Sequence, residues 1–192
     1  MDKLEIRSSG AVRAAAGRLE GYAAVFNAEA ALPGFVEVIR AGAFARSLQA
    51  GDNIRALYHH RDAELLASTR SGTLTLREDH HGLAFSLSIP DTSYGRDLAV
   101  LVERGDVAGC SFGFHVRDGG DRWEDRGDGA YVRELLDVEL REITVTGDPA
   151  YSDTSVALRG LDALVSDRNF SDAIRDPIIA GVPQYFFLET CR

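Results

Sequence analysis

The sequence predicts a mainly β protein with a few helices, an α+β fold in which short strands form a barrel or a sandwich. Short runs of β-branched, aromatic and other apolar residues recur between Gly, Pro, Asn and Asp turn signals, at the spacing of roughly 8 to 12 residues that is typical of such folds. One longer stretch, near residues 91–105, has clear helical periodicity bounded by caps. The succession of short strands favours a mostly antiparallel sheet.

Length and composition are those of a single globular domain. The chain has 192 residues, 45% hydrophobic and 27% charged, which is enough for one sizeable core. No apolar run approaches the roughly 20 residues that cross a bilayer, and residues 1–7 lack the apolar core of a secretory signal. We therefore expect no membrane association and a cytoplasmic location.

Charge and cysteine content exclude further classes of protein. The net charge is −9, with 30 acidic and 21 basic residues, and nucleic-acid binders usually show a concentrated basic face. We expect no nucleic-acid partner. Cys110 and Cys191 stand far apart in unrelated contexts, which argues against a disulfide framework.

The first elements follow from apolar runs bounded by turn residues. Residues 19–26 predict a strand, and residues 35–39 predict a second strand after a Pro-Gly turn. Residues 41–48, with aromatic and apolar side chains four apart on one face, predict a short helix that stops at Gly51.

Two histidines directly follow the third predicted strand, residues 54–58. Alternation along a strand would send the side chains of His59 and His60 to opposite faces. Only one of them could then meet a partner on a given face.

Three further short strands come next, at residues 65–68, 73–76 and 83–89. The polar turn before the last of them carries His80 and His81. We expect these two histidines to lie in a solvated loop.

A capped helix interrupts the strands. Asp91 or Thr92 can accept hydrogen bonds from the first turn, apolar residues recur at helical spacing, and Gly105 stands where a C′ glycine belongs. The helix leads directly into a Gly-rich strand.

That strand places a hydroxyl group among glycines and aromatics. Alternation puts Cys110, Phe112 and Phe114 on a core face, and Ser111, Gly113 and His115 on the opposite face. The missing side chain at Gly113 leaves room for another chain to approach Ser111. Ser111 is therefore a candidate nucleophile, with a purely structural serine as the alternative.

The last strand region contains a break in its alternation. Residues 118–129 predict exposed turns around Trp123, and residues 131–140 resume a strand. Leu136, Val138 and Leu140 share one parity, whereas Ile143 and Val145 share the other. If all five face the core, a β-bulge near Arg141 and Glu142 must insert one residue, and it would re-aim Glu142. The alternative is two separate strands with a bend and Glu142 in solvent.

These positions supply the residue types of a serine hydrolase. Acyl transfer by serine needs a hydroxyl, a base and a third group that orients the base, and the candidates are Ser111, His60 and Glu142. Their spacing does not show that they are adjacent. A zinc hydrolase built on the five histidines is a rival, but no His-x-x-x-His or Cys-x-x-Cys spacing supports it.

Several segments in a fixed order carry a family resemblance. They are residues 21–27, 39–44, 56–60, 82–85, 91–92, 104–114 and 142–151, including Ser111-Phe112-Gly113-Phe114. Together they resemble the prohead (capsid maturation) serine protease family of tailed phages, which is similar in fold and active-site order to the herpesvirus assemblin proteases. The resemblance covers about residues 19–154.

The resemblance implies a single antiparallel β-barrel like the herpesvirus protease fold, with helices packed around it. The expected domain spans residues 1–159. Residues 160–192 would then be a variable C-terminal tail, with a targeting or self-cleaved segment as one interpretation.

The resemblance also assigns roles in the site. It implies His60 as the base, Ser111 as the nucleophile and Glu142 as the third member, in preference to Asp137, Glu139 or Asp148, with no cofactor and no metal. Arg61 stands where the family usually has an acid, which leaves His59 as the alternative base. The loop Gly147-Asp148 is a candidate for the oxyanion hole.

The implied activity is a serine endopeptidase of phage head maturation. Such an enzyme would act inside the immature capsid in the cytoplasm of the bacterial host. Its expected substrates are scaffold or the scaffold-like arm of the major capsid protein, and itself. A homo-oligomer is one candidate assembly state of this enzyme. The alternative function is that of a non-catalytic barrel that serves as a scaffold or capsid-binding module.

Overall fold

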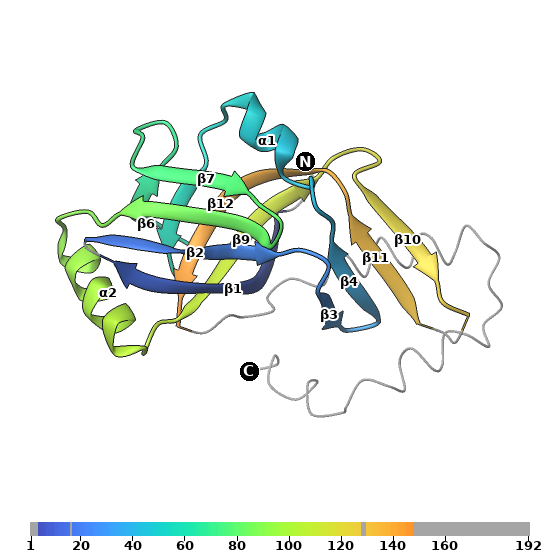
Figure 1. Cartoon of the computed structure of the whole chain (residues 1–192), viewed down its shortest axis with the longest axis horizontal. Helices are drawn as coiled ribbons and strands as arrows, with labels where there is room; N and C mark the ends of the chain where they lie inside the picture. Colours follow the sequence, from blue (N-terminus) through green and yellow to red (C-terminus); the bar gives the residue numbers. More distant parts are fainter. Residues whose placement is uncertain (1–3, 16, 128–129, 148–192) are drawn as a thin grey trace, which may run out of the picture.

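The computed structural model describes residues 4–15, 17–127 and 130–147. Within these residues it shows two β-sheets and two helices (Figure 1). The strands are β1 (Glu5–Ala15), β2 (Arg18–Val25), β3 (Glu29–Leu32), β4 (Phe35–Ile39), β5 (Arg55–Tyr58), β6 (Arg61–Ser68), β7 (Leu74–Glu78), β8 (Gly82–Ser88), β9 (Gly109–Val116), β10 (Asp121–Asp125), β11 (Tyr131–Leu135) and β12 (Val138–Thr146). The helices are α1 (Ala45–Ala50) and α2 (Ser93–Arg104). The predicted domain boundary at residue 159 and the tail 160–192 lie outside the described residues.

The larger sheet forms a nearly closed barrel. Its eight strands follow the order β6-β5-β12-β9-β1-β2-β8-β7, and the sheet curls so that the edge strand β6 comes close to β8. The smaller sheet has the order β10-β11-β4-β3 and stands beside the barrel, at the right of Figure 1. The mainly β prediction is therefore confirmed.

The prediction of a purely antiparallel barrel is wrong, because each sheet contains one parallel pair. β12 pairs with β5 in parallel, and β11 pairs with β4 in parallel. Chain neighbours joined by short turns can only pair antiparallel, and the sequence pattern reports those local pairs. Pairs between strands distant in the chain depend on how the sheet curls, which the pattern does not show.

The predicted helix near residues 91–105 is confirmed together with its caps. Thr92, rather than Asp91, is the N-cap, and its Oγ1 accepts a hydrogen bond of 3.1 Å from the backbone N–H of Gly95. Gly105 ends α2 with φ 81°, a left-handed conformation that glycine adopts without steric cost.

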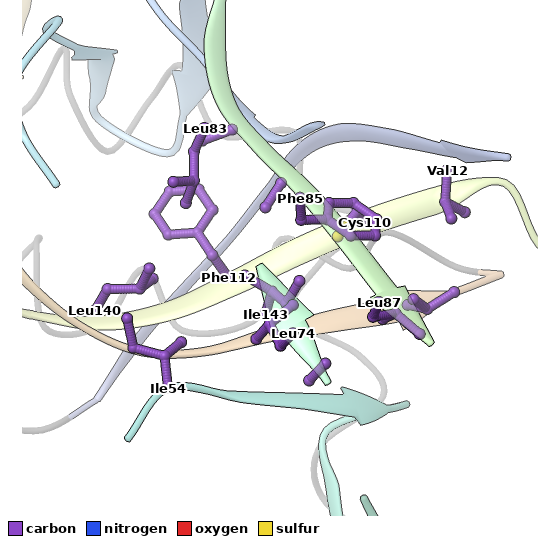
Figure 2. Packing of buried hydrophobic residues seen from close by; sticks show 14 of the residues in the cluster. Val12, Ile54, Leu74, Leu83, Phe85, Leu87, Cys110, Phe112, Leu140 and Ile143 are labelled. Carbon is purple, nitrogen blue, oxygen red and sulfur yellow. The ribbon is translucent and has the colours of Figure 1, made fainter. Parts of the chain in front are cut away.

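The barrel interior is filled by the side chains that alternation assigns to it. Phe112 and Ile143 point into the barrel beside Leu83, Phe85 and Leu87 (Figure 2). All five are at most 4% exposed, and burial of each such side chain contributes about 1.5–3 kcal/mol.

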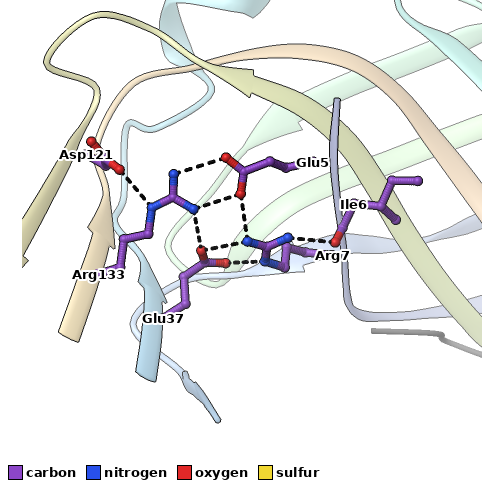
Figure 3. Close-up of polar contacts among 6 residues, drawn as sticks. All are labelled: Glu5, Ile6, Arg7, Glu37, Asp121 and Arg133. Carbon is purple, nitrogen blue, oxygen red and sulfur yellow. Dashed lines mark hydrogen bonds and ion pairs between the residues drawn. The ribbon is translucent and has the colours of Figure 1, made fainter. Parts of the chain in front are cut away.

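A buried ion cluster joins the small sheet to the barrel. Arg7 on β1 contacts Glu37 on β4 at 2.6 Å and Glu5 at 2.8 Å. Arg133 on β11 contacts Glu5 at 2.7 Å and Asp121 at 2.8 Å (Figure 3). Burial by itself lowers the pKa of the Arg133 guanidinium, but hydrogen bonds and charges of its acidic neighbours outweigh burial and raise that pKa. Each buried charge of the cluster therefore has a partner of opposite sign.

Several element predictions need correction. Residues 131–140 were expected as one strand but form β11 and β12, which belong to different sheets. Leu136 lies at the break between them and is 38% exposed, so it does not share the core face of Val138 and Leu140. The region around Trp123 was expected as turns, but it contains β10, whose polar composition suits an edge strand. The pattern also missed β1 and β3.

Candidate active site

Strand β9 presents Ser111 on the face opposite the core. Cys110, Phe112 and Phe114 are fully buried in the barrel, as alternation predicts, so the intervening Ser111 points to the other face. Ser111 itself is also buried. Gly109 and Gly113, two residues away on either side, give Ser111 no neighbouring side chain on its own strand.

The turn between β5 and β6 carries both histidines. Tyr58 pairs with Arg61, so His59 and His60 form a two-residue hairpin loop. Their φ angles are 51° and 58°, and positive φ at both central residues is the pattern of a type I′ turn. Residues other than glycine rarely adopt this conformation, which costs of order 1 kcal/mol or more.

The turn, and not strand alternation, separates the two histidines. The prediction that alternation sends them to opposite faces is wrong in its reason, because neither residue continues the strand. His59 is exposed, and its Nδ1 lies 3.1 Å from Thr146 Oγ1. His60 reaches in the other direction, toward Ser111.

Strand β12 contains the predicted bulge. Leu140 pairs with Phe114 and Glu142 pairs with Gly113, so Arg141 is the inserted residue. Glu142 is thereby buried on the same face as Ser111. A Cβ atom at Gly113 would lie 2.9 Å from Glu142 Cγ, and the absent side chain is therefore what admits the carboxylate.

Three predicted side chains meet on this face. Ser111 Oγ lies 2.7 Å from His60 Nε2, and His60 Nδ1 lies 2.7 Å from Glu142 Oε1. Because a carboxylate can only accept hydrogen bonds, Nδ1 donates to Glu142, and Nε2 is left to accept from the Ser111 hydroxyl. The side chains come from three neighbouring elements of the sheet: His60 from the turn after β5, Glu142 from β12 and Ser111 from β9.

Arg55 is a neighbour of the site that sequence reasoning missed. It pairs in register with Glu142, and its guanidinium lies 3.6 Å from Glu142 Oε2 and 2.6 Å from Asp62. No local signal could reveal it, because the parallel pairing of β5 and β12 joins strands about 80 residues apart.

Two of the three alternative acidic residues, Asp137 and Glu139, contact arginines and not His60. Asp137 contacts Arg46 and Arg117, and Glu139 contacts Arg141. Asp148 lies outside the described residues, so the Gly147-Asp148 loop has no structural description beyond Gly147, which follows β12.

The other histidines do not join the group around Ser111. His80 and His81 are exposed, and His81 packs edge-on against Tyr22 at 4.5 Å between ring centroids. Within the described ranges, no three His, Cys, Asp or Glu side chains gather as they would around a metal ion. The described helices include none with the length and apolar character of a membrane span.

The comparisons with known proteins bear on this geometry. No curated protein and no solved structure matches the chain. The family model of the Caudovirus prohead serine protease matches residues 2–166, which include β5, β9 and β12 with the three side chains that meet. The chain therefore belongs to the family of caudovirus prohead serine proteases.

Proposed function

We propose that this protein is the serine endopeptidase of phage head maturation, with Ser111 as the nucleophile, His60 as the general base and Glu142 as the residue that orients the base. The observation that carries the proposal is the unbroken series of two 2.7 Å contacts from Ser111 through His60 to Glu142. Membership of the protease family supports the class of reaction.

The contacts define the direction of proton transfer. As Ser111 Oγ attacks the carbonyl carbon of the scissile peptide bond, its proton passes to His60 Nε2. Glu142 accepts from Nδ1–H throughout and stabilises the imidazolium that forms. His60 then gives the proton to the leaving amine, and it activates a water molecule that hydrolyses the acyl-enzyme.

Access to Ser111 is part of this mechanism. Ser111 is buried, while the side chain of His60 is 25% exposed. Binding of a peptide must therefore bring Ser111 Oγ within reach of the scissile carbonyl.

The proposed substrates follow from the family alone. They are scaffold or the scaffold-like arm of the major capsid protein, and the protease itself, cleaved inside the immature capsid in the host cytoplasm. The alternative of a non-catalytic scaffold or capsid-binding barrel requires no reactive serine.

A fluorophosphonate probe separates the two functions. The wild-type protein should be labelled at one site, and Ser111→Ala should abolish labelling and cleavage of capsid or scaffold substrate. Circular dichroism of this variant should match the wild type, because the change removes one atom. Ser86→Ala, in β8 of the same sheet, is the matched control and should label normally. Labelling or full proteolysis by Ser111→Ala would refute the nucleophile assignment.

A further inference from the structure

Thr144 is a buried residue of the site that the mechanism above does not use. It lies on β12 between Glu142 and Thr146, on the face that carries Ser111, and it is fully buried. Its Oγ1 has no hydrogen-bond partner among the residues that the structure describes. A buried hydroxyl without a partner is uncommon in native proteins and carries a desolvation penalty.

The neighbouring strands leave Ser111 as the polar side chain that faces Thr144. On β9, Thr144 pairs directly with Ser111, and opposed residues of an antiparallel pair have Cβ atoms about 4.5–5.5 Å apart. On the other side, Thr144 pairs with Leu57 of β5, which is apolar and fully buried. The His60 imidazole bridges Ser111 and Glu142. Ser111 is the cross-strand partner of Thr144 on β9, and Glu142 precedes Thr144 by two residues on β12.

The negative charge that develops on Ser111 Oγ favours a hydrogen bond from the Thr144 hydroxyl to that oxygen. In the resting site Ser111 Oγ is neutral and donates its proton to His60 Nε2. As that proton leaves, negative charge grows on Oγ, and a hydrogen bond from a hydroxyl to a charged oxygen is stronger than one to a neutral oxygen. A contact made only at this stage lowers the barrier without tightening substrate binding.

We propose that Thr144 is a further catalytic residue, whose hydroxyl donates a hydrogen bond to Ser111 Oγ while the Ser111 proton moves to His60. The Ser111 O–H bond breaks and a His60 Nε2–H bond forms, whereas Thr144 keeps its own proton. This inference rests on the proposed role of Ser111 as the nucleophile.

Fluorophosphonate labelling of the full chain measures this step without a protein substrate. In the labelling reaction Ser111 Oγ bonds to phosphorus, fluoride leaves, and the serine proton passes to His60. Thr144→Val keeps the shape of the side chain and removes the hydroxyl, and it should lower the second-order labelling rate by about 10- to 100-fold. Its melting temperature should equal or exceed that of the wild type, because an unpartnered buried hydroxyl is lost.

Two further variants complete the test. Thr144→Ser keeps the hydroxyl and should label within about threefold of the wild-type rate. Thr75→Val, on β7 at the far edge of the same sheet, should label at the wild-type rate. A wild-type labelling rate in Thr144→Val would overturn the proposal. So would a slow Thr144→Val that has a lower melting temperature and is not restored by Thr144→Ser. An unlabelled wild-type protein would instead contradict the proposed function, which Ser111→Ala tests separately.

Discussion

The hydrogen-bonding groups of single side chains decide which roles the residues of the site can fill. Glu142 can only accept, so it fixes the proton of His60 on Nδ1 and leaves Nε2 free for Ser111. His59 is adjacent in sequence, yet its Nδ1 lies next to Thr146. The same residue type therefore has two roles at neighbouring positions.

Alanine substitutions should separate the two histidines. His60→Ala removes the base that contacts Ser111 and should lower kcat by at least about 10³-fold. His59→Ala should reduce activity only mildly, because it removes a contact to Thr146 and leaves the Ser111–His60 contact in place. Steady-state cleavage of one peptide by both variants checks this. If His59→Ala is the inactive variant, the assignment of the base is wrong.

Glu142→Gln should lower kcat strongly, yet by less than the loss of Ser111 or His60. The amide can donate to Nδ1 and so favours the tautomer that cannot accept the Ser111 proton. In a well-studied triad the orienting acid matters less than the nucleophile or base by a factor on the order of ten to a hundred.

The comparison set for this prediction is Asp137→Asn, Glu139→Gln and Asp148→Asn, measured on the same peptide. Asp137 and Glu139 contact surface arginines, so their variants should keep nearly wild-type kcat. A wild-type kcat in Glu142→Gln, together with a loss in one of the three, would show that another acid orients His60.

At the level of elements, two local irregularities bring the site together. The left-handed β5–β6 turn turns His60 back across β12, and the bulge at Arg141 moves Glu142 to the face of Ser111. Without the inserted residue, Glu142 would lie on the same face of β12 as Val138 and Leu140, which packs into the core. Regular strands alone would not bring Ser111, His60 and Glu142 together.

Gly113→Ala tests the close approach of β9 and β12. The new methyl group would lie 2.9 Å from Glu142 Cγ and 3.3 Å from Leu4 Cδ2, so the Glu142 side chain must shift from its present position. We expect kcat to fall by about tenfold or more, because displacement of a group that orients the base by a fraction of an ångström is costly, with little change in KM. Peptide kinetics measure kcat and KM, and thermal melting checks that the variant is folded. Wild-type kcat in this variant would show that the Glu142 position is not critical.

At the scale of the whole molecule, the small sheet is attached to the barrel by charges in its interior. Arg7 and Arg133 lie between Glu5, Glu37 and Asp121, and β1 contributes residues both to this cluster and to the sheet next to β9. The cluster therefore links the small sheet to the strand beside the site. Removing one member leaves the other charges buried without compensation.

Arg133→Met should lower the free energy of unfolding by about 3–5 kcal/mol. The exposed pair of Arg13 and Glu20 provides the control, and Arg13→Met should change the free energy by less than about 1 kcal/mol. Urea unfolding followed by circular dichroism measures both variants. Equal, small effects would show that the cluster adds little to stability.

The sequence by itself determined the features that depend on neighbours along the chain. Alternation in β9 separated Ser111 from the core aromatics, the parity change after Leu140 predicted the bulge beside Glu142, and cap residues defined α2. Each of these is a local effect of backbone period or hydrogen bonding within a few residues. The resemblance carried by Ser111-Phe112-Gly113-Phe114 added the family, which the family match confirms.

Only the tertiary structure decided what depends on strands that are distant in the chain. The parallel pairing of β5 with β12 sets Arg55 beside Glu142, and the pairing of β12 with β9 sets Thr144 opposite Ser111. The ion cluster likewise needs β1 and β11, whose residues are over a hundred positions apart. These pairs depend on how the whole sheet curls, because strand order and register are set by closing the barrel around its core and not by neighbours along the chain.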